Sequence, residues 1–167
     1  MIHARIVEAL EALAGERVAE QVERLAHHAW RGEAWDKTLA YCRQAGEKAM
    51  ARSAHGEAAG YFEQALAALE HLPNSRAATE QAIDLRLALR TALQPSVDLG
   101  RILAVLHEAE ALAVALDDSR RLGQVSISLA VQCIFRGAYD QAIACGQRAL
   151  GLATASGEVV MSVLANQ

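Results

Sequence analysis

Proline is almost absent from this sequence, and aromatic residues are scarce. Two of the 167 residues are proline, and 4% of the chain is aromatic. Proline interrupts helices because it lacks a backbone N–H and clashes with the preceding turn, so its rarity leaves room for many helices. Alanine, which loses no side-chain entropy in a helix, is the commonest residue. The composition therefore predicts helices that pack closely through small side chains.

Cysteine is too rare and too irregularly spaced for a disulfide framework or a zinc site. Cys42, Cys133 and Cys145 form no C-x-x-C pair. We interpret all three as small buried apolar residues in a reducing compartment, which favours a cytoplasmic location. A disulfide between Cys133 and Cys145 would need Cα atoms within roughly 7 Å. Two buried thiols are the favoured interpretation.

Long basic runs and long apolar runs are also missing. The net charge is −4, and the largest basic cluster is Arg120–Arg121, so no phosphate-binding track is present. Arg5, Glu8 and Glu11 interrupt the first apolar stretch, which excludes a secretory signal there. No apolar run approaches the roughly 18 residues of a membrane span. We expect neither a nucleic-acid nor a membrane partner.

Apolar residues recur with the helical period almost throughout the chain. Glycine and proline mark the helix ends, at Gly15, Gly32, Pro73, Pro95 and Gly137. We expect eight helices, at about 3–13, 17–31, 34–52, 56–71, 76–94, 98–116, 119–136 and 139–155, and the beginning of a ninth over 158–167.

Side chains that can cap helices precede three of these segments. Asn74 or Ser75 can cap the fifth helix, Ser96 or Asp98 the sixth, and one of Asp117, Asp118 and Ser119 the seventh. The connections are a few residues long, so consecutive helices must run antiparallel. The fold class is therefore all-α, either a bundle or a solenoid, and internal repetition decides between them.

Three segments align with one another, at 46–69, 90–112 and 130–152. The first and third resemble the tetratricopeptide repeat, and in the middle one Arg90 replaces the small residue. The resemblance implies an antiparallel helix-pair solenoid with a right-handed superhelix. Equivalent sites 62, 106 and 146 lie 44 and 40 residues apart, which predicts helices longer than those of the 34-residue standard repeat. The positions expected to pack the repeats are Gly46, Ala58, Phe62, Ala65, Leu106, Ala109, Ala130, Gly137, Tyr139, Ala142 and Ala149.

A second resemblance covers the whole chain. The stretches His3–Arg5, Leu25–His28 and Tyr41–Ala49 resemble the linker and first repeats that follow the ATPase module of large bacterial signalling ATPases, some of which carry a class III nucleotide cyclase domain. The resemblance implies that this chain is part of a longer protein whose other domains hold the ATPase or cyclase chemistry. It divides the chain into a helical linker (1–32), three helix pairs (33–157) and the start of a further repeat (158–167).

Catalytic and cofactor motifs are not recognisable. No phosphate-binding G-x-x-x-x-G-K-[ST] loop occurs. His27 and His28 are adjacent on a helix and point about 100° apart, so they do not make the i, i+4 metal pair. Asp117 and Asp118 are better explained as helix caps than as metal ligands. We expect no enzyme activity in this chain, no metal and no cofactor.

The expected function is a non-catalytic scaffold for signal transduction that binds a protein or an intramolecular domain. The alternative is a solenoid that holds a small effector in its concave groove. In a tetratricopeptide array the groove is lined by the first helix of each pair. The positions that correspond are Arg43, Glu47, Met50, Asp84, Leu87, Thr91, Gln124, Ser128 and Val131.

Two further features suggest contacts. Trp30 and Trp35 flank the turn at Gly32, either as a docking site or, as we favour, as a staple between the second and third helices. Residues 158–167 are apolar for a terminal cap, with Val160 and Leu164 among them. We therefore expect a homodimer through the exposed C-terminal end.

Overall fold

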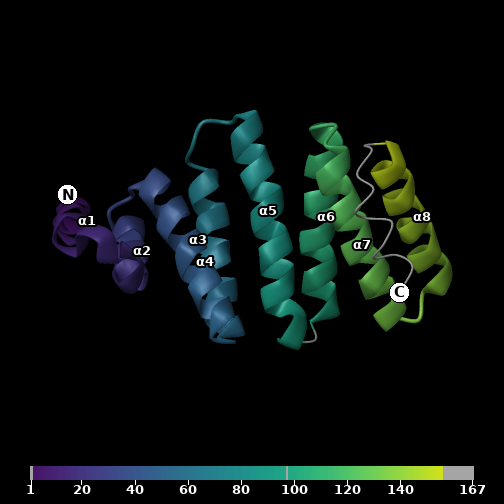
Figure 1. The fold of residues 1–167 in the computed structure, drawn as a ribbon, viewed down its shortest axis with the longest axis horizontal. Coiled ribbons are helices and arrows are strands. Elements are labelled where there is room, and N and C mark those ends of the chain that lie inside the picture. Colours follow the sequence, from purple (N-terminus) through teal and green to yellow (C-terminus); the bar gives the residue numbers. More distant parts are fainter. Residues whose placement is uncertain (1, 97, 156–167) are drawn as a thin grey trace. The chain divides into compact units, whose positions relative to one another are not determined.

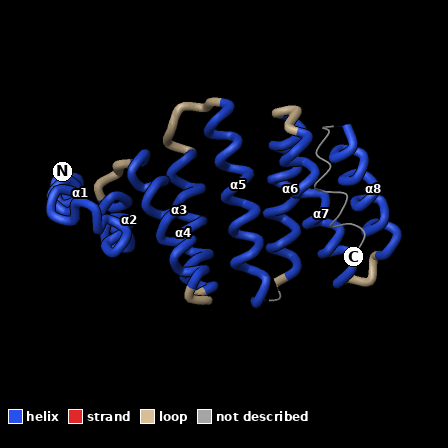
Figure 2. The backbone as a smooth tube through the Cα atoms, viewed as in Figure 1, coloured by secondary structure: helices blue, strands red, loops and turns tan. Residues whose placement is uncertain are grey.

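A computed structural model describes the chain over residues 2–96 and 98–155. Within these ranges all regular secondary structure is helical, which confirms the all-α prediction (Figure 2). The expected ninth helix, at 158–167, lies outside the described residues. The elements are α1 (Ile2–Ala14), the 3-10 segment η1 (Gly15–Gln21), α2 (Val22–Arg31), α3 (Trp35–Ala51), α4 (His55–Leu69), α5 (Arg76–Leu93), the 3-10 turn η2 (Gln94–Ser96), α6 (Leu99–Ala115), α7 (Ser119–Phe135) and α8 (Tyr139–Ala155). Figure 1 labels the α-helices.

The chain forms two compact units. Among the described residues, unit 1 comprises 2–78 and 91–96, and unit 2 comprises 79–90 and 98–155, so α5 contributes to both. In unit 1, α3 packs against both α2 and α4, and in unit 2, α7 packs against both α6 and α8.

The second helix begins later than predicted. Instead of an α-helix from residue 17, residues 15–21 form η1, and Arg17 has non-helical dihedral angles (φ −95°, ψ 21°). The Lys48 ammonium of α3 donates to the carbonyl oxygens of Ala19 and Glu20. A donor from another helix thus binds carbonyl groups that an α-helix would have bonded to its own backbone.

Unit 1 is built on small residues and a few large ones. Val7, Leu25 and Ala29 form one buried cluster between α1 and α2. On α3 and α4, the buried residues are mostly alanine, and Phe62 is the largest fully buried side chain. Glu11 of α1 accepts hydrogen bonds from Lys37 and Tyr41 of α3, which ties the first helix to the third.

Unit 2 adds a polar component to its apolar core. Ile83, Ile102, Leu106 and Val125 are fully buried. Polar side chains also connect neighbouring helices of this unit. The Arg148 guanidinium of α8 donates to the Ser126 hydroxyl of α7 at 2.9 Å and forms an ion pair with Glu110 of α6. Further ion pairs connect α5 to its neighbours, Arg86 to Glu108 of α6 at 2.9 Å and Asp84 to Arg121 of α7 at 2.9 Å.

Capping residues fix three helix starts. Of the candidates in the sequence, the structure uses Ser75, Asp98 and Asp118, whose side chains accept from the backbone N–H of the residue three positions later. This is the N-cap bond that satisfies one of the otherwise unpaired amides of the first turn.

Four of the turns between helices share one geometry. Glu33, Ser53, Asp117 and Gly137 all have positive φ, between 53° and 72°. In each turn the N–H of the next residue bonds to the carbonyl five positions back, for example Ala54 to Ala49 and Ala138 to Cys133. This is the Schellman ending of a helix, in which a left-handed residue reverses the chain. In unit 1 two such turns connect α2 to α3 and α3 to α4. In unit 2 two more connect α6 to α7 and α7 to α8.

Candidate functional site

The groove residues expected on α3 lie at the surface of unit 1. Arg43 and Glu47 are exposed and form an i, i+4 ion pair at 3.1 Å, while Met50 is half-buried. The pair satisfies both charges, and a ligand would have to displace it. At such exposure the ion pair contributes only about 0.3–0.5 kcal/mol, so displacement is easy.

Among the groove residues expected on α5, Asp84 has a structural partner. Its two carboxylate oxygens accept from Nε and Nη2 of Arg121 at 2.9 and 3.0 Å. Arg121 also donates to Asp118 at 2.7 Å, and these hydrogen bonds, with Asp84 first, raise the pKa of its guanidinium. Asp84 therefore positions α5 against α7. Leu87 is half-buried and Thr91 is exposed.

The groove residues expected on α7 share one face. Gln124, Ser128 and Val131 follow each other at i, i+4 and i+7, and all three are half-buried. The Ser128 hydroxyl donates to the Gln124 carbonyl at 3.0 Å, so it is bonded within its own helix. This face presents an amide and small apolar groups rather than charge.

A hollow of about 460 Å³ in unit 1 includes one of the predicted residues. Glu47, Gln44 and Lys48 of α3 line one side, and Ala19 and Glu20 of η1, with Val22, line the other. The Lys48 ammonium is bonded to Glu23 at 2.9 Å as well as to the η1 carbonyls. Two of its lining residues, Ala19 and Glu20, belong to η1, which the sequence did not predict.

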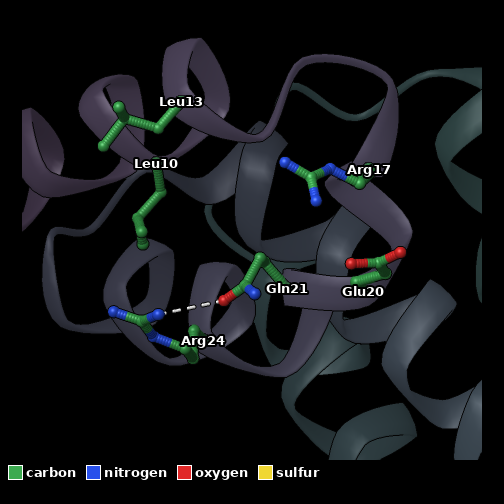
Figure 3. A pocket seen from close by; sticks show the side chains of 6 residues that line it. All are labelled: Leu10, Leu13, Arg17, Glu20, Gln21 and Arg24. Atoms are coloured by element: carbon green, nitrogen blue, oxygen red, sulfur yellow. Dashed lines mark hydrogen bonds between the residues drawn. The ribbon is translucent and has the colours of Figure 1, made fainter.

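A second hollow, of about 310 Å³, lies between α1, η1 and α2. Its lining residues, drawn in Figure 3, are Leu10, Leu13, Arg17, Glu20, Gln21 and Arg24. The Arg24 guanidinium donates to the Gln21 side-chain oxygen at 3.0 Å. Two leucines beside two arginines and one glutamate give an apolar wall with a net positive rim. The sequence did not predict these lining residues, which come from α1, the unpredicted segment η1 and α2.

Unit 2 exposes large apolar side chains on its last two described helices. Six of them are between 42% and 65% exposed: Ile127, Ile134 and Phe135 on α7, and Tyr139, Ile143 and Leu150 on α8. We name these six the α7–α8 patch. Tyr139 was expected among the repeat-packing residues, and it is 64% exposed, whereas Ala142 and Ala149 are buried.

The other residues expected to pack the repeats lie mostly inside. Ala58, Phe62, Ala65, Leu106 and Ala109 are buried, as is Gly46, while Ala130 is half-buried and Gly137 is an exposed turn residue. Gly137 acts through its φ of 72°, not through packing.

Histidines gather where the two ends of α1 and α2 meet. Nδ1 of His3 lies 2.9 Å from Nδ1 of His28, and the His27 ring packs edge-on against the His28 ring. Burial, with the neighbouring His27 and His3, lowers the pKa of His28. Over residues 2–96 and 98–155 no three His, Cys, Asp or Glu side chains are grouped to hold a metal ion.

The cysteine thiols are free. Burial raises the pKa of Cys42 to about 12, which makes it unreactive at neutral pH. The two tryptophans contact each other edge-on, with ring centroids 5.8 Å apart, in the geometry of the expected staple. Trp35 also stacks on His71 with ring centroids 3.9 Å apart, a contact between α3 and the turn after α4 that the sequence did not predict.

Comparisons with known proteins give no further assignment. No family model matches the sequence, and no curated protein matches it either. In the described ranges, no helix has both the length and the apolar character needed to cross a bilayer.

Proposed function

We propose that this chain is a non-catalytic protein-interaction scaffold made of tetratricopeptide-like helix pairs. In this proposal it is a regulatory or sensor arm of a multidomain bacterial signalling ATPase or nucleotide cyclase, and it works in the cytoplasm. The regular antiparallel pairs, the repeated Schellman turns and the small residues between α3 and α4 support the repeat assignment. The repeats 46–69 and 130–152 of the sequence support it independently.

The α7–α8 patch carries the proposal of protein binding. A soluble monomer rarely exposes a contiguous apolar patch of more than a few hundred Å², and larger patches mark interaction sites. Phe135 and Tyr139, the two aromatic members, are of the residue type enriched at protein interfaces. A small polar ligand gains little by contact with such a surface, whereas the apolar face of another protein segment can bury its own apolar area against it.

Site-specific photo-crosslinking tests the proposal. A benzophenone side chain is placed at Tyr139, inside the patch, and in a matched variant at Val114, which is 58% exposed on α6 but outside the patch. We expect irradiation of cells that express each variant to give a protein adduct at position 139 and none at 114. Equal labelling at both positions, or no adduct at 139, contradicts the proposal.

A second candidate function is supported by the 310 Å³ hollow. Its two arginines and two leucines suit a small anion with an apolar tail, such as an aliphatic carboxylate. Thermal-shift measurements with such carboxylates are expected to raise the melting temperature of the wild-type chain but not of Arg17→Gln/Arg24→Gln. An equal shift in both proteins would place the ligand elsewhere, and no shift with any carboxylate would remove this candidate.

A further inference from the structure

Two histidine rings meet where the start of α1 lies against the end of α2. The Nδ1 atoms of His3 and His28 are 2.9 Å apart, and the ring planes are inclined by 27° with centroids 5.2 Å apart. At this distance one Nδ1 atom donates a hydrogen bond and the other accepts it. A protonated imidazole carries a hydrogen on both ring nitrogens and can accept none. The contact therefore holds one proton between the two Nδ1 atoms, and at most one of the rings can be charged.

Few other side-chain contacts hold the first turn of α1. Ile2 is 76% exposed, so it does not anchor this turn. The backbone of the turn lies close to the end of α2, because a Cβ atom built on Gly32 would come within 2.8 Å of the backbone nitrogen of Ala4. Loss of the bond between His3 and His28 would leave this backbone approach without the side chains that join the two helices.

The charged groups that act on His28 are all positive when protonated. They are His27 and Arg24 of α2 and His3 of α1, and together with burial, the largest cause, they lower the pKa of His28. In the described part of the chain, no carboxylate of α1, η1 or α3 acts on this ring. His3 also lies in the first turn of α1, where the helix dipole disfavours a positive charge. A second proton on the pair therefore has no anion to balance it.

The rest of α1 has anchors that do not involve histidine. Val7 is fully buried in an apolar cluster with α2, and Glu11 accepts hydrogen bonds from side chains of α3. Both residues lie further along α1 than His3. Separation of the two rings is therefore expected to release residues 2–6, while the helix from Val7 onward stays in place.

We propose that the His3–His28 pair is a pH-sensitive switch, closed when the two Nδ1 atoms share one proton and opened when both rings are protonated. Opening moves the first turn of α1 away from the turn at Gly32, through which α2 leads into α3. The inference goes beyond the proposed function, since it does not depend on any bound partner.

The direction of the pH dependence follows from the lowered pKa of His28. A base whose pKa falls on folding stabilises the fold above its unfolded pKa, and this contribution is lost as the pH falls through the lowered folded value. The ordinary pKa of histidine is about 6.5. The switch is therefore closed at neutral pH and opens in mild acid.

Long-range ¹H–¹⁵N NMR spectra of the histidine side chains test the closed contact. At about pH 7.5, one ring of the pair is expected to carry its hydrogen on Nδ1 and the other to leave its Nδ1 atom free as the acceptor. Two rings that both carry hydrogen on Nε2 alone could not form the bond, and this result would overturn the inference.

Amide hydrogen exchange measures the opening. The amides of Ile6 and Val7 bond to the carbonyl groups of residues 2 and 3 in a helix that begins at Ile2. Between about pH 7.5 and pH 5, their protection factors, which already account for the intrinsic pH dependence of exchange, are expected to fall about fivefold or more. The amide of Cys42, buried in α3, is the internal reference and is expected to keep its protection.

Replacement of either ring separates this switch from general acid destabilisation. In His3→Gln and in His28→Gln, two positive charges can no longer meet, so the protection of Ile6 and Val7 is expected to become independent of pH in this range. His107→Gln, the matched change at an exposed histidine of α6, is expected to keep the full wild-type fall. Circular dichroism checks that all three variants keep the helical fold.

The decisive quantity is the loss of pH dependence, whether a glutamine variant is closed or open at both pH values. A wild-type chain whose α1 protection does not change with pH would overturn the inference. So would a fall of the same size in the wild type, His3→Gln and His28→Gln, because the acid effect would then arise elsewhere.

Discussion

Gly46 of α3 lies directly against the ring of Phe62 of α4. A Cβ atom built on Gly46 would come within 2.5 Å of Cε1 and 2.8 Å of Cδ1 of that ring. Real Cβ atoms do not approach other heavy atoms this closely. Phe62 is 1% exposed, so its ring has no room to withdraw. The missing side chain at position 46 is therefore what lets a large residue fill the space between two helices whose buried residues are mostly small.

Substitution of Gly46 is expected to destabilise the chain even with a better helix former. At an open helical site, Gly→Ala gains up to about 1 kcal/mol. At Gly46, overpacking against Phe62 is expected to outweigh this gain, so that Gly46→Ala lowers the free energy of unfolding by about 1 kcal/mol and Gly46→Leu by roughly 1–3 kcal/mol. Urea denaturation measures both values.

A matched control exists on the neighbouring helix. A Cβ at Gly60 of α4 meets no atom within 4 Å. Gly60→Ala is expected to stabilise the chain by about 0.5–1 kcal/mol. In the double variant Gly46→Ala/Phe62→Leu, the smaller side chain at position 62 makes room for the new Cβ atom. This variant is expected to recover part of the unfolding free energy that Gly46→Ala loses. If Gly46→Ala behaves like Gly60→Ala, the close packing of α3 on α4 is not as described.

The left-handed turn residues give a second prediction. Ser53 is exposed with φ of 60°, a region that costs an L-residue about 1–2 kcal/mol and glycine very little. Ser53→Gly is expected to raise the free energy of unfolding by about 0.5–1 kcal/mol. Gly137→Ala, at the equivalent turn of unit 2 with φ of 72°, is expected to lower it by about 1 kcal/mol. Thermal unfolding that moves in the same direction for both variants would show that the shared turn geometry is wrong.

Backbone constraints made most of the fold predictable from the sequence. Gly32, Pro73 and Pro95 cannot continue a helix without cost, so they marked helix ends within a few residues. Ser75 and Asp98 carry short side-chain oxygens that cap helices. These signals are local, since each acts on the backbone of its own turn.

The features that were not predicted depend on contacts between distant residues. η1 has a helical sequence pattern, and Lys48, far along the chain, bonds its carbonyl groups. The turn at Ser53 contains no glycine, so its positive φ could not be predicted from the residue type. Repeat position predicts Asp84 as a groove residue, and its pairing with Arg121, 37 residues away, was not predicted. Neither spacing nor composition encodes such pairings when only one sequence is read.

Nucleotide binding is not expected. The sequence has no phosphate-binding loop, and the described residues contain no group of three side chains that could hold the metal ion of a nucleotide. Calorimetric titration of the folded chain with ATP and Mg²⁺ is expected to show no heat beyond dilution, and incubation is expected to yield no cyclic nucleotide. Binding at micromolar strength would overturn the scaffold proposal and point to a nucleotide-sensing arm.

The last prediction concerns pH and the contact between α1 and α3. Glu11 accepts a hydrogen bond from the Lys37 ammonium at 2.7 Å and another from the Tyr41 hydroxyl, and these two bonds, Lys37 first, hold the pKa of Glu11 below its usual value. A carboxyl group whose pKa falls on folding stabilises the fold above its unfolded pKa, and the contribution disappears as pH falls through the folded pKa. Burial, together with Glu11, raises the pKa of Tyr41 to about 12, so the phenol contributes stability that is lost as pH rises from about 10 toward 12.

Other carboxyl groups also titrate in acid, so the informative quantity is the difference between variants in how unfolding free energy changes with pH. Between pH 7 and pH 3, wild type is expected to lose about 0.5–1 kcal/mol more unfolding free energy than Glu11→Gln, a modest value because the pair is partly exposed to solvent. Tyr41→Phe is expected to retain most of the acid-side loss, since Lys37 remains, and to remove the alkaline loss that this phenol causes. Parallel pH profiles for wild type and Glu11→Gln in urea denaturation would show that α1 is not held to α3 by this carboxylate.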